Sequence, residues 1–225
     1  MTDRSAYWAV LRRPPLGLAG VCVALVCIFL IAGVDKPLIL WALDRVTPQT
    51  YALFSVITDA GNATGYVIIT LAFMLWWRHR IMTGAPPIPL QRRILGSWYL
   101  LLTLAATGLF HHALKIVIGR YRPRYLVGED LYGLSPFNFH TNMNGFPSGH
   151  TQTAFAIATC LFLLYPRLWP VYFGAAILVG MSRIALGAHY LGDVVFGAYV
   201  GIAGAVLMHR YYLKPRLQRL ENGYR

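Results

Sequence analysis

The chain has 225 residues, of which 57% are hydrophobic and only 12% are charged. Soluble domains carry about 25% charged residues, so this composition excludes an ordinary water-exposed surface. The formal net charge of +12 would suit a nucleic-acid partner, but the distribution of the basic residues along the chain argues against that class of function.

Six long apolar runs, separated by short polar segments, organise the whole chain. A helix needs about 17 to 25 residues to cross a bilayer, and in lipid its backbone polar groups must be satisfied within the segment. We therefore predict an all-α, integral membrane six-helix bundle that forms one domain over residues 1–225. No clear small-residue cleavage site follows the first run, so we expect a retained span rather than a signal peptide. The predicted spans are 17–34, 58–77, 94–118, 149–165, 168–186 and 190–209.

The basic residues indicate the orientation of these spans. With an inside N-terminus, the inside segments are 1–16, 78–93, 166–167 and 209–225, and they hold 13 of the 20 Lys and Arg but only two of the eight acids. This positive-inside excess predicts cytoplasmic N- and C-termini. Together with the compact plan it suggests a bacterial inner membrane. The charge is then a topology signal, and we expect no nucleic-acid partner.

Several ionisable residues outside these segments gather at the other membrane face. Spans three and five end there, and spans four and six begin there. Ionisable groups at membrane depth are costly, so a set that converges on one surface predicts a functional site. Its members are Lys115, Arg122, His150, Arg183, His189 and Asp193.

The spacing within this set is informative. Lys115 and Arg122 are seven residues apart and share one helical stripe, unless Pro123 ends the helix early and leaves Arg122 on a loop. His189 and Asp193 are four residues apart, so the carboxylate can orient the imidazole.

A helix start adds a further feature. Ser148 and Gly149 fall where the fourth span begins, and unpaired amides at a helix N-terminus attract anions. Cations, such a helix start and two histidines predict a phosphate site, in which one histidine attacks phosphorus and the other protonates the leaving oxygen. No cluster of metal-binding residues accompanies them, so we expect the cations to replace a metal and predict no cofactor.

Three motifs carry a family resemblance. K-I-V-I-G-R-Y-R-P (Lys115 to Pro123) fits K-x6-R-P, P-S-G-H begins at Pro147, and S-R-I-A-L-G-A-H-Y-L-G-D (Ser182 to Asp193) fits S-R-x5-H-x3-D. The chain resembles the type-2 phosphatidic acid phosphatase family, which shares its active site with the vanadium haloperoxidases. The resemblance implies that His189 is the nucleophile, Asp193 its orienting carboxylate and His150 the general acid. It also implies that the phosphoryl oxygens are bound by Lys115, Arg122, Ser148, Gly149 and Arg183.

We therefore expect a membrane lipid phosphatase with a periplasmic active site and a phosphohistidine intermediate. Its substrate is expected among phosphatidic acid, phosphatidylglycerophosphate, undecaprenyl pyrophosphate and a lipid A phosphate. Lipid-to-lipid phosphate transfer is the alternative within enzymes. A non-catalytic transporter or scaffold with the same fold is the alternative from another class. The oligomeric state is not readable.

Some residues keep two interpretations. His111 either lines the pocket or packs against another helix, and packing is favoured. Asp59 and Asn62 either support the site or make a polar helix contact. Arg120 and Arg124 lie outside the motif and suit a position among lipid headgroups. The remaining histidines, His79, His112, His140 and His209, are expected to carry no chemistry.

Three further features complete the pattern. The segment 119–149 is rich in Tyr and Phe, and we expect it to lie against the headgroup layer and shape lipid entry. The proline-rich segment 83–91 is expected to be a linker. Cys22, Cys27 and Cys160 lie in apolar runs and predict neither a disulfide framework nor a metal site.

Overall fold

A computed structural model describes residues 15–137, 139–140 and 143–222. Most of the predicted first inside segment, including Arg4, Arg12 and Arg13, lies outside these residues, as does Arg225. The described chain is an all-α membrane protein, in which five helical segments are long and apolar enough to cross a bilayer. These are Leu16–Arg45, Pro48–Met82, Pro87–Ile118, Pro166–Ala185 and Leu191–Asn222.

The elements follow one another with short connections except for one long loop between α7 and α8. In chain order they are α2 (Leu16–Phe29), the π-helical turn η1 (Leu30–Val34), α3 (Asp35–Arg45), α4 (Pro48–Asp59), α5 (Ala63–Met82), α6 (Pro87–Ile118), α7 (Pro123–Glu129), α8 (Gly149–Leu164), the 3-10 turn η2 (Pro166–Leu168), α9 (Trp169–Ala185), α10 (Leu191–Met208), the π-helical turn η3 (His209–Leu213) and α11 (Lys214–Asn222).

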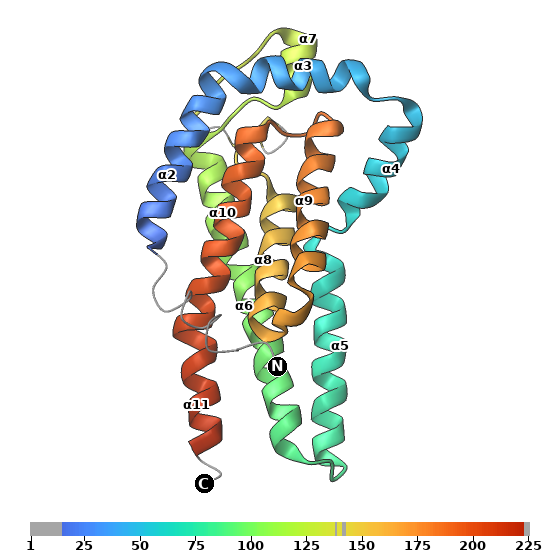
Figure 1. Cartoon of the computed structure of the whole chain (residues 1–225), viewed down its shortest axis with the longest axis vertical. Helices are drawn as coiled ribbons and strands as arrows, with labels where there is room; N and C mark the ends of the chain where they lie inside the picture. The colour runs from blue at the N-terminus through green and yellow to red at the C-terminus, as the bar shows by residue number, and fades with distance from the viewer. Residues whose placement is uncertain (1–14, 138, 141–142, 223–225) are drawn as a thin grey trace.

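Helix α8 lies in the middle of the bundle, between α6, α9 and α10 (Figure 1). It has 16 residues and therefore spans about 24 Å, which is short for a helix that must cross a bilayer alone. Most of its side chains are buried against the neighbouring helices rather than exposed. The six-span prediction is thus supported by the five longer segments, and for α8 it stays a prediction.

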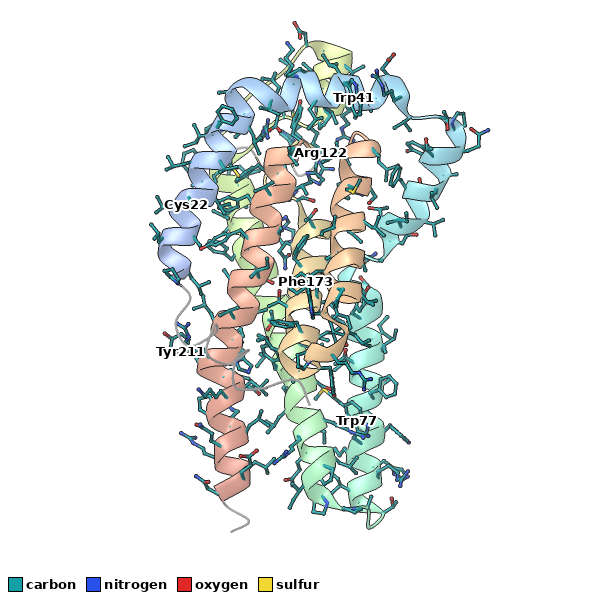
Figure 2. All side chains as sticks on the ribbon, viewed as in Figure 1. Cys22, Trp41, Trp77, Arg122, Phe173 and Tyr211 are labelled. Carbon is teal, nitrogen blue, oxygen red and sulfur yellow. The ribbon has the colours of Figure 1, made fainter. Side chains whose placement is uncertain are left out.

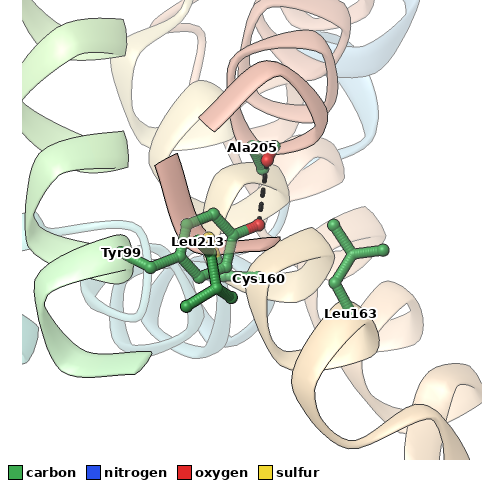
Figure 3. Packing of buried hydrophobic residues seen from close by; sticks show 5 residues of the cluster. All are labelled: Tyr99, Cys160, Leu163, Ala205 and Leu213. Atoms are coloured by element: carbon green, nitrogen blue, oxygen red, sulfur yellow. Dashed lines mark hydrogen bonds between the residues drawn. The ribbon is translucent and has the colours of Figure 1, made fainter. Parts of the chain in front are cut away.

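Small residues let α10 approach α8 closely. A Cβ atom added to Gly197 would lie 2.6 Å from the carbonyl oxygen of Ser148, so the backbones are in direct contact there. Below this contact, Tyr99, Cys160, Leu163, Ala205 and Leu213 form a packed cluster, and the Tyr99 hydroxyl donates to the Ala205 carbonyl oxygen at 2.9 Å (Figure 3). Close backbone contact and this cluster hold α10 against α6 and α8.

The first helical segment extends beyond the end of the predicted span. Residues 17–34 are helical as expected, but the helix continues through η1 into α3, and Figure 1 shows α3 lying across the end of the bundle. The direction changes where the apolar run ends at Asp35, whose carboxylate is buried. Helix α3 therefore covers the end of the bundle at which the candidate site lies.

Three predicted boundaries differ from the helix boundaries. Residue 58 lies inside α4, which has Thr47 as its N-cap and Pro48 in its first turn, and α5 begins at Ala63 within the same apolar segment, Pro48–Met82. The predicted linker 83–91 is shorter than expected, because α6 already begins at Pro87, a favourable first helical position for proline. The sixth span continues through η3 into α11.

The segment 119–149 is less of a surface loop than predicted. It contains α7, and two of its aromatic residues pack inward. Phe146 is buried against Phe196, and the hydroxyl of Tyr132 donates to the carbonyl oxygen of Ile31 at 2.6 Å. Phe137 and Phe139 are strongly exposed. The predicted headgroup-facing surface can therefore include these two residues but not the buried part of the segment.

Candidate active site

Two cations reach the site from the end of α6. The helix ends at Ile118 because Gly119 adopts φ 52°, so Arg122 lies on the following segment, as the proline predicted. Lys115 Nζ donates to the carbonyl oxygen of Asn144 at 2.9 Å, and Arg122 Nε donates to the same oxygen at 3.4 Å. One backbone carbonyl thereby holds both side chains in place.

The third cation comes from α9. Arg183 donates through Nη1 to Thr58 Oγ1 at 2.7 Å, so α4 positions this guanidinium. Its Nε atom is buried and has no hydrogen-bond partner among the described residues. An unsatisfied buried donor is costly, and an anion's oxygen would satisfy it. Figure 2 shows Arg122 at this end of the bundle, beneath α3 and between the ends of α9 and α10.

The P-S-G-H motif forms the start of α8, as predicted. Ser148 is the N-cap residue, and its backbone N–H donates to the carbonyl oxygen of Asp193 at 3.0 Å, which ties the motif to α10. The Ser148 hydroxyl is fully buried and pairs with Thr151 Oγ1 at 2.9 Å. Either hydroxyl can be the donor in this pair, so the Ser148 hydroxyl can make the predicted phosphate contact while it accepts from Thr151.

His111 packs against this same motif. Its Nε2 atom lies 3.1 Å from the carbonyl oxygen of Pro147, and a Cβ atom added to Gly149 would lie 3.0 Å from the ring. The favoured interpretation of His111 as a packing residue agrees with these contacts, and the element it contacts is the start of α8. Gly149 is needed there because any side chain would press on the imidazole.

His150 occupies the first turn of α8, close to the junction between α4 and α5. A Cβ atom added to Gly61 would lie 2.7 Å from the His150 Cβ, so this junction touches the residue directly. Asp59 and Arg183 are within electrostatic range of its ring. Asn62 instead caps α5, accepting the N–H of Thr64 at 3.0 Å, which accounts for its presence without a role in the site.

His189 lies in the turn before α10 rather than on the helix. Its backbone N–H donates to the Arg183 carbonyl oxygen at 3.2 Å, and its Nδ1 atom is 3.5 Å from Asp193 Oδ2. The predicted pairing is therefore close, although the helical spacing was the wrong reason for it, and the distance is long for a good hydrogen bond. Burial lowers the pKa of His189 to about 4, with Asp193 opposing the shift and Arg122 and Lys115 adding to it. This shift favours the neutral imidazole, which has a lone pair available on one ring nitrogen.

Asp193 has a second partner that the sequence did not indicate. Its Oδ1 atom accepts from Arg120 Nη1 at 2.7 Å, while Oδ2 accepts the Tyr190 backbone N–H at 2.9 Å. Arg120 is completely buried, so its interpretation as a headgroup-facing side chain was wrong. Its guanidinium lies 4.2 Å from the centre of the Tyr190 ring. Arg124, by contrast, is exposed, which agrees with an interfacial position.

Arg120 also binds Asp35 of α3. Its Nη1 atom is 2.9 Å from Asp35 Oδ2, and Asp35 Oδ1 accepts the Gly192 backbone N–H at 3.1 Å. The opposing carboxylates hold the pKa of Arg120 above its usual value although burial acts in the other direction. Arg120, Asp35 and Asp193, all with fully buried side chains, form what we call the buried charge cluster.

The predicted site residues thus lie at one end of the bundle, but sequence reasoning missed several of their supports. The missed residues are Asp35, Thr58, Arg120, Tyr132 and Asn144. Asp35 had a usable signal, because it is an acid at the outer end of the first apolar run. Among the described residues no group of three or more His, Cys, Asp or Glu could hold a metal ion.

Comparisons with known proteins define the class. Residues 96–216, more than half of the chain, match the PAP2 superfamily, and the chain belongs to this superfamily. It is a multi-pass membrane protein with relatives in bacteria. The resemblance drawn from the three motifs is therefore confirmed at the level of the family.

Individual relatives cover part of the chain. A lipid A 1-phosphatase of Rhizobium johnstonii is 36% identical over 121 residues, which are 51% of this chain and 50% of that protein. The undecaprenyl-diphosphatase BcrC of Bacillus subtilis is 35% identical over 98 residues, 43% of this chain and 48% of that protein. The chain thus matches about half the length of these curated relatives.

Solved structures share the fold. LpxE of Aquifex aeolicus superposes with a TM-score of 0.57 at 23% identity, covering 80% of this chain and 96% of that one. A PAP2-type phosphatidylglycerolphosphate phosphatase of Bacillus subtilis has the same TM-score and identity, covering 87% and 96%.

Proposed function

We propose that the protein is a lipid phosphatase that acts through a phosphohistidine and needs no metal. The chain would cross the membrane six times, with α8 as the fourth span and the site at the periplasmic face. The observation that carries the proposal is a buried His189 facing Asp193, at the end of the bundle where Lys115, Arg122 and Arg183 converge from separate segments.

The reaction follows from these positions. The lone pair of His189 attacks phosphorus, and the bond from phosphorus to the lipid oxygen breaks as His150 donates a proton to that oxygen. Water then attacks the phosphohistidine, with His150 accepting its proton, and phosphate leaves. The three cations neutralise the negative charge that develops on the phosphoryl oxygens in both steps. A metal ion would otherwise provide this stabilisation.

Lipid A 1-phosphate is our first candidate substrate. The names of the relatives support it ahead of undecaprenyl pyrophosphate, and both ahead of phosphatidic acid and phosphatidylglycerophosphate. All four lipids present a terminal phosphate to the same cations, so the distinction must come from the lipid part.

Phosphate release from the four lipids by the purified protein, with a chelator present, tests the proposal. We expect release from one lipid well above the others, reduced to background in His189→Ala and by about 10²- to 10⁴-fold in His150→Ala. His112→Ala is the matched control, because this neighbouring histidine is exposed and should leave the rate unchanged.

Two results would count against this mechanism. Full activity in a folded His189→Ala protein removes the nucleophile from the proposal, and loss of activity with chelator removes metal independence. If wild-type protein releases no phosphate but a second lipid in the mixture gains one, the activity is lipid-to-lipid transfer instead.

A further inference from the structure

A cavity lies between the helices at the end of the bundle opposite the candidate active site. Its volume is 390 Å³, and its walls come from α5, α6, α8, η3 and α11. Trp77, at this end of α5, marks its position in Figure 2. None of its lining residues belongs to the site described above.

The cavity exists because α8 is short. At 16 residues α8 extends about 24 Å, whereas α6 has 32 residues and extends about 48 Å. Among the described residues, the chain turns back after Leu164 through η2, whereas α5, α6 and α11 continue past this point (Figure 1) and line the cavity. The fold therefore leaves a cavity between the helices that is partly open to the surface of the bundle.

The walls are mostly apolar but hold one unsatisfied donor. Leucines and aromatic rings line the sides, among them Phe73, Leu164 and Leu217. The Trp77 indole Nε1 is buried without a hydrogen-bond partner in the described part of the chain. Leaving such a donor unpaired is costly, so an occupant that offers an acceptor there is favoured over a purely apolar one.

The mouth of the cavity is basic. Arg92 and Arg93 lie in succession on α6 and are both exposed. Arg92 Nη2 also contacts Glu221 Oε1 at 2.8 Å, in a half-exposed ion pair. The three side chains together carry one net positive charge, which one phosphodiester would neutralise.

We propose that this cavity binds one acidic phospholipid of the surrounding bilayer, such as phosphatidylglycerol. Its phosphodiester lies at Arg92 and Arg93, an ester carbonyl accepts from the Trp77 indole, and an acyl chain occupies the apolar wall. Basic pockets between membrane helices recognise lipid headgroups in this way. The proposal does not depend on the reaction at the other end of the molecule.

Native mass spectrometry of the whole purified protein tests it, with phosphatidylglycerol and phosphatidylcholine of equal chain length supplied after delipidation. We expect one phosphatidylglycerol to be retained in preference to phosphatidylcholine. Arg92→Gln with Arg93→Gln should weaken that retention by about fivefold for each arginine. Arg78→Gln with Arg80→Gln is the matched control. These two arginines lie on α5, at the same end of the bundle as Arg92 and Arg93, but they do not line the cavity, so lipid retention should stay unchanged.

Two single variants separate lipid binding from simple structural effects. Glu221→Gln breaks the same ion pair as Arg92→Gln but leaves both arginines, so it should keep or strengthen retention. Trp77→Phe should weaken retention of both lipids because each offers an ester carbonyl, whereas Trp76→Phe, at an exposed neighbouring position, should not.

Equal retention of the two lipids by wild type would overturn the proposal, as would equal losses in the Arg78 and Arg80 control. A loss in Glu221→Gln as large as in the variant with both Arg92→Gln and Arg93→Gln would also overturn it, because the ion pair alone would then matter. Circular dichroism spectra and elution volumes of all variants are compared with wild type, so that a loss through misfolding is recognised.

Discussion

The carboxylate of Asp193 has to serve several partners at once. Its Oδ1 atom is held by Arg120, so its Oδ2 atom is turned toward the Tyr190 N–H and the His189 ring. Arg120 thus acts on His189 only through Asp193, as a positioning residue. Without Asp35, Arg120 would fully neutralise Asp193 and weaken its attraction for a positively charged imidazole.

Asp35→Asn tests this division of charge. The amide oxygen can still accept the Gly192 N–H, which turns the amide NH2 toward Arg120 and removes that ion pair. Arg120 keeps its contact with Asp193, so the fold should survive. Outer-shell carboxylates that orient metal-ligating histidines contribute about 10- to 100-fold, and we expect a loss of kcat/KM of about that size here, transmitted through Arg120 and Asp193. Removing a negative charge disfavours protonation of His189, whose pKa burial already lowers, so the acid limb of the pH profile should move to lower pH.

Asp44→Asn is the control on the same helix, because Asp44 is exposed and should have no effect on rate or pH profile. An Asp35→Asn protein with wild-type kcat/KM and an unmoved acid limb would contradict the argument. Arg120→Gln is less informative, because it leaves two buried carboxylates without a counter-charge, at a cost of about 3–5 kcal/mol in the free energy of unfolding.

The motif residues could be predicted from the sequence because three short patterns carry them. The buried charge cluster could not, because its partners are far apart in the chain. Gly192 and Asp35 are 157 residues apart, and Arg120 and Asp193 are 73 apart. A single sequence shows that Arg120 and Asp35 are charged but not that α3 folds over the end of the bundle to bring them together.

Among the elements, the segment between α6 and α8 divides into an anchored part and an exposed part. Tyr132 and Phe146 pack against the helices, whereas Phe137 and Phe139 are 69% and 75% exposed. Aromatic side chains favour the membrane interface, so the two exposed rings suit contact with the lipid headgroup layer.

We predict that Phe137→Ser with Phe139→Ser impairs turnover of a lipid substrate more than turnover of a water-soluble phosphate ester. The soluble ester reaches the cations without crossing the headgroup layer, so its rate should stay near wild type. Val127→Ser, at an exposed position on α7, controls for the loss of apolar surface in general. Equal losses on both substrates would show that the rings support the site itself.

The helix boundaries show which signals were overlooked. Helix α4 has a proline in its first turn and a reciprocal Thr47–Thr50 capping box, both visible in the sequence. It was missed because a search for apolar runs does not weigh capping residues. Helix α11 was also missed by a search for apolar runs. Its sequence, K-P-R-L-Q-R-L-E-N, is too polar to be recognised as a membrane span.

At the scale of the whole molecule, the two ends carry different charges. The candidate site and the covering helix α3 lie at one end. The opposite end carries many basic residues of α5, α6, η3 and α11 (Figure 1). These are Arg78, Arg80, Arg92, Arg93, Arg210, Lys214, Arg216 and Arg219. From the positive-inside rule we predict that this end lies in the cytoplasm, so the candidate site would face the periplasm.

Single cysteines test this orientation. In a background with Cys22, Cys27 and Cys160 replaced by alanine or serine, Glu129→Cys reports the site end and Thr83→Cys the basic end; both positions are exposed. A maleimide that cannot cross the inner membrane should label Glu129→Cys in intact spheroplasts and Thr83→Cys only after the membrane is broken. The helices between these positions pack in one bundle, so their orientations are linked. The reverse labelling pattern would therefore mean that the whole protein has the opposite orientation, with the candidate site in the cytoplasm. Labelling of both positions in sealed spheroplasts would mean that the charge asymmetry does not set a single orientation.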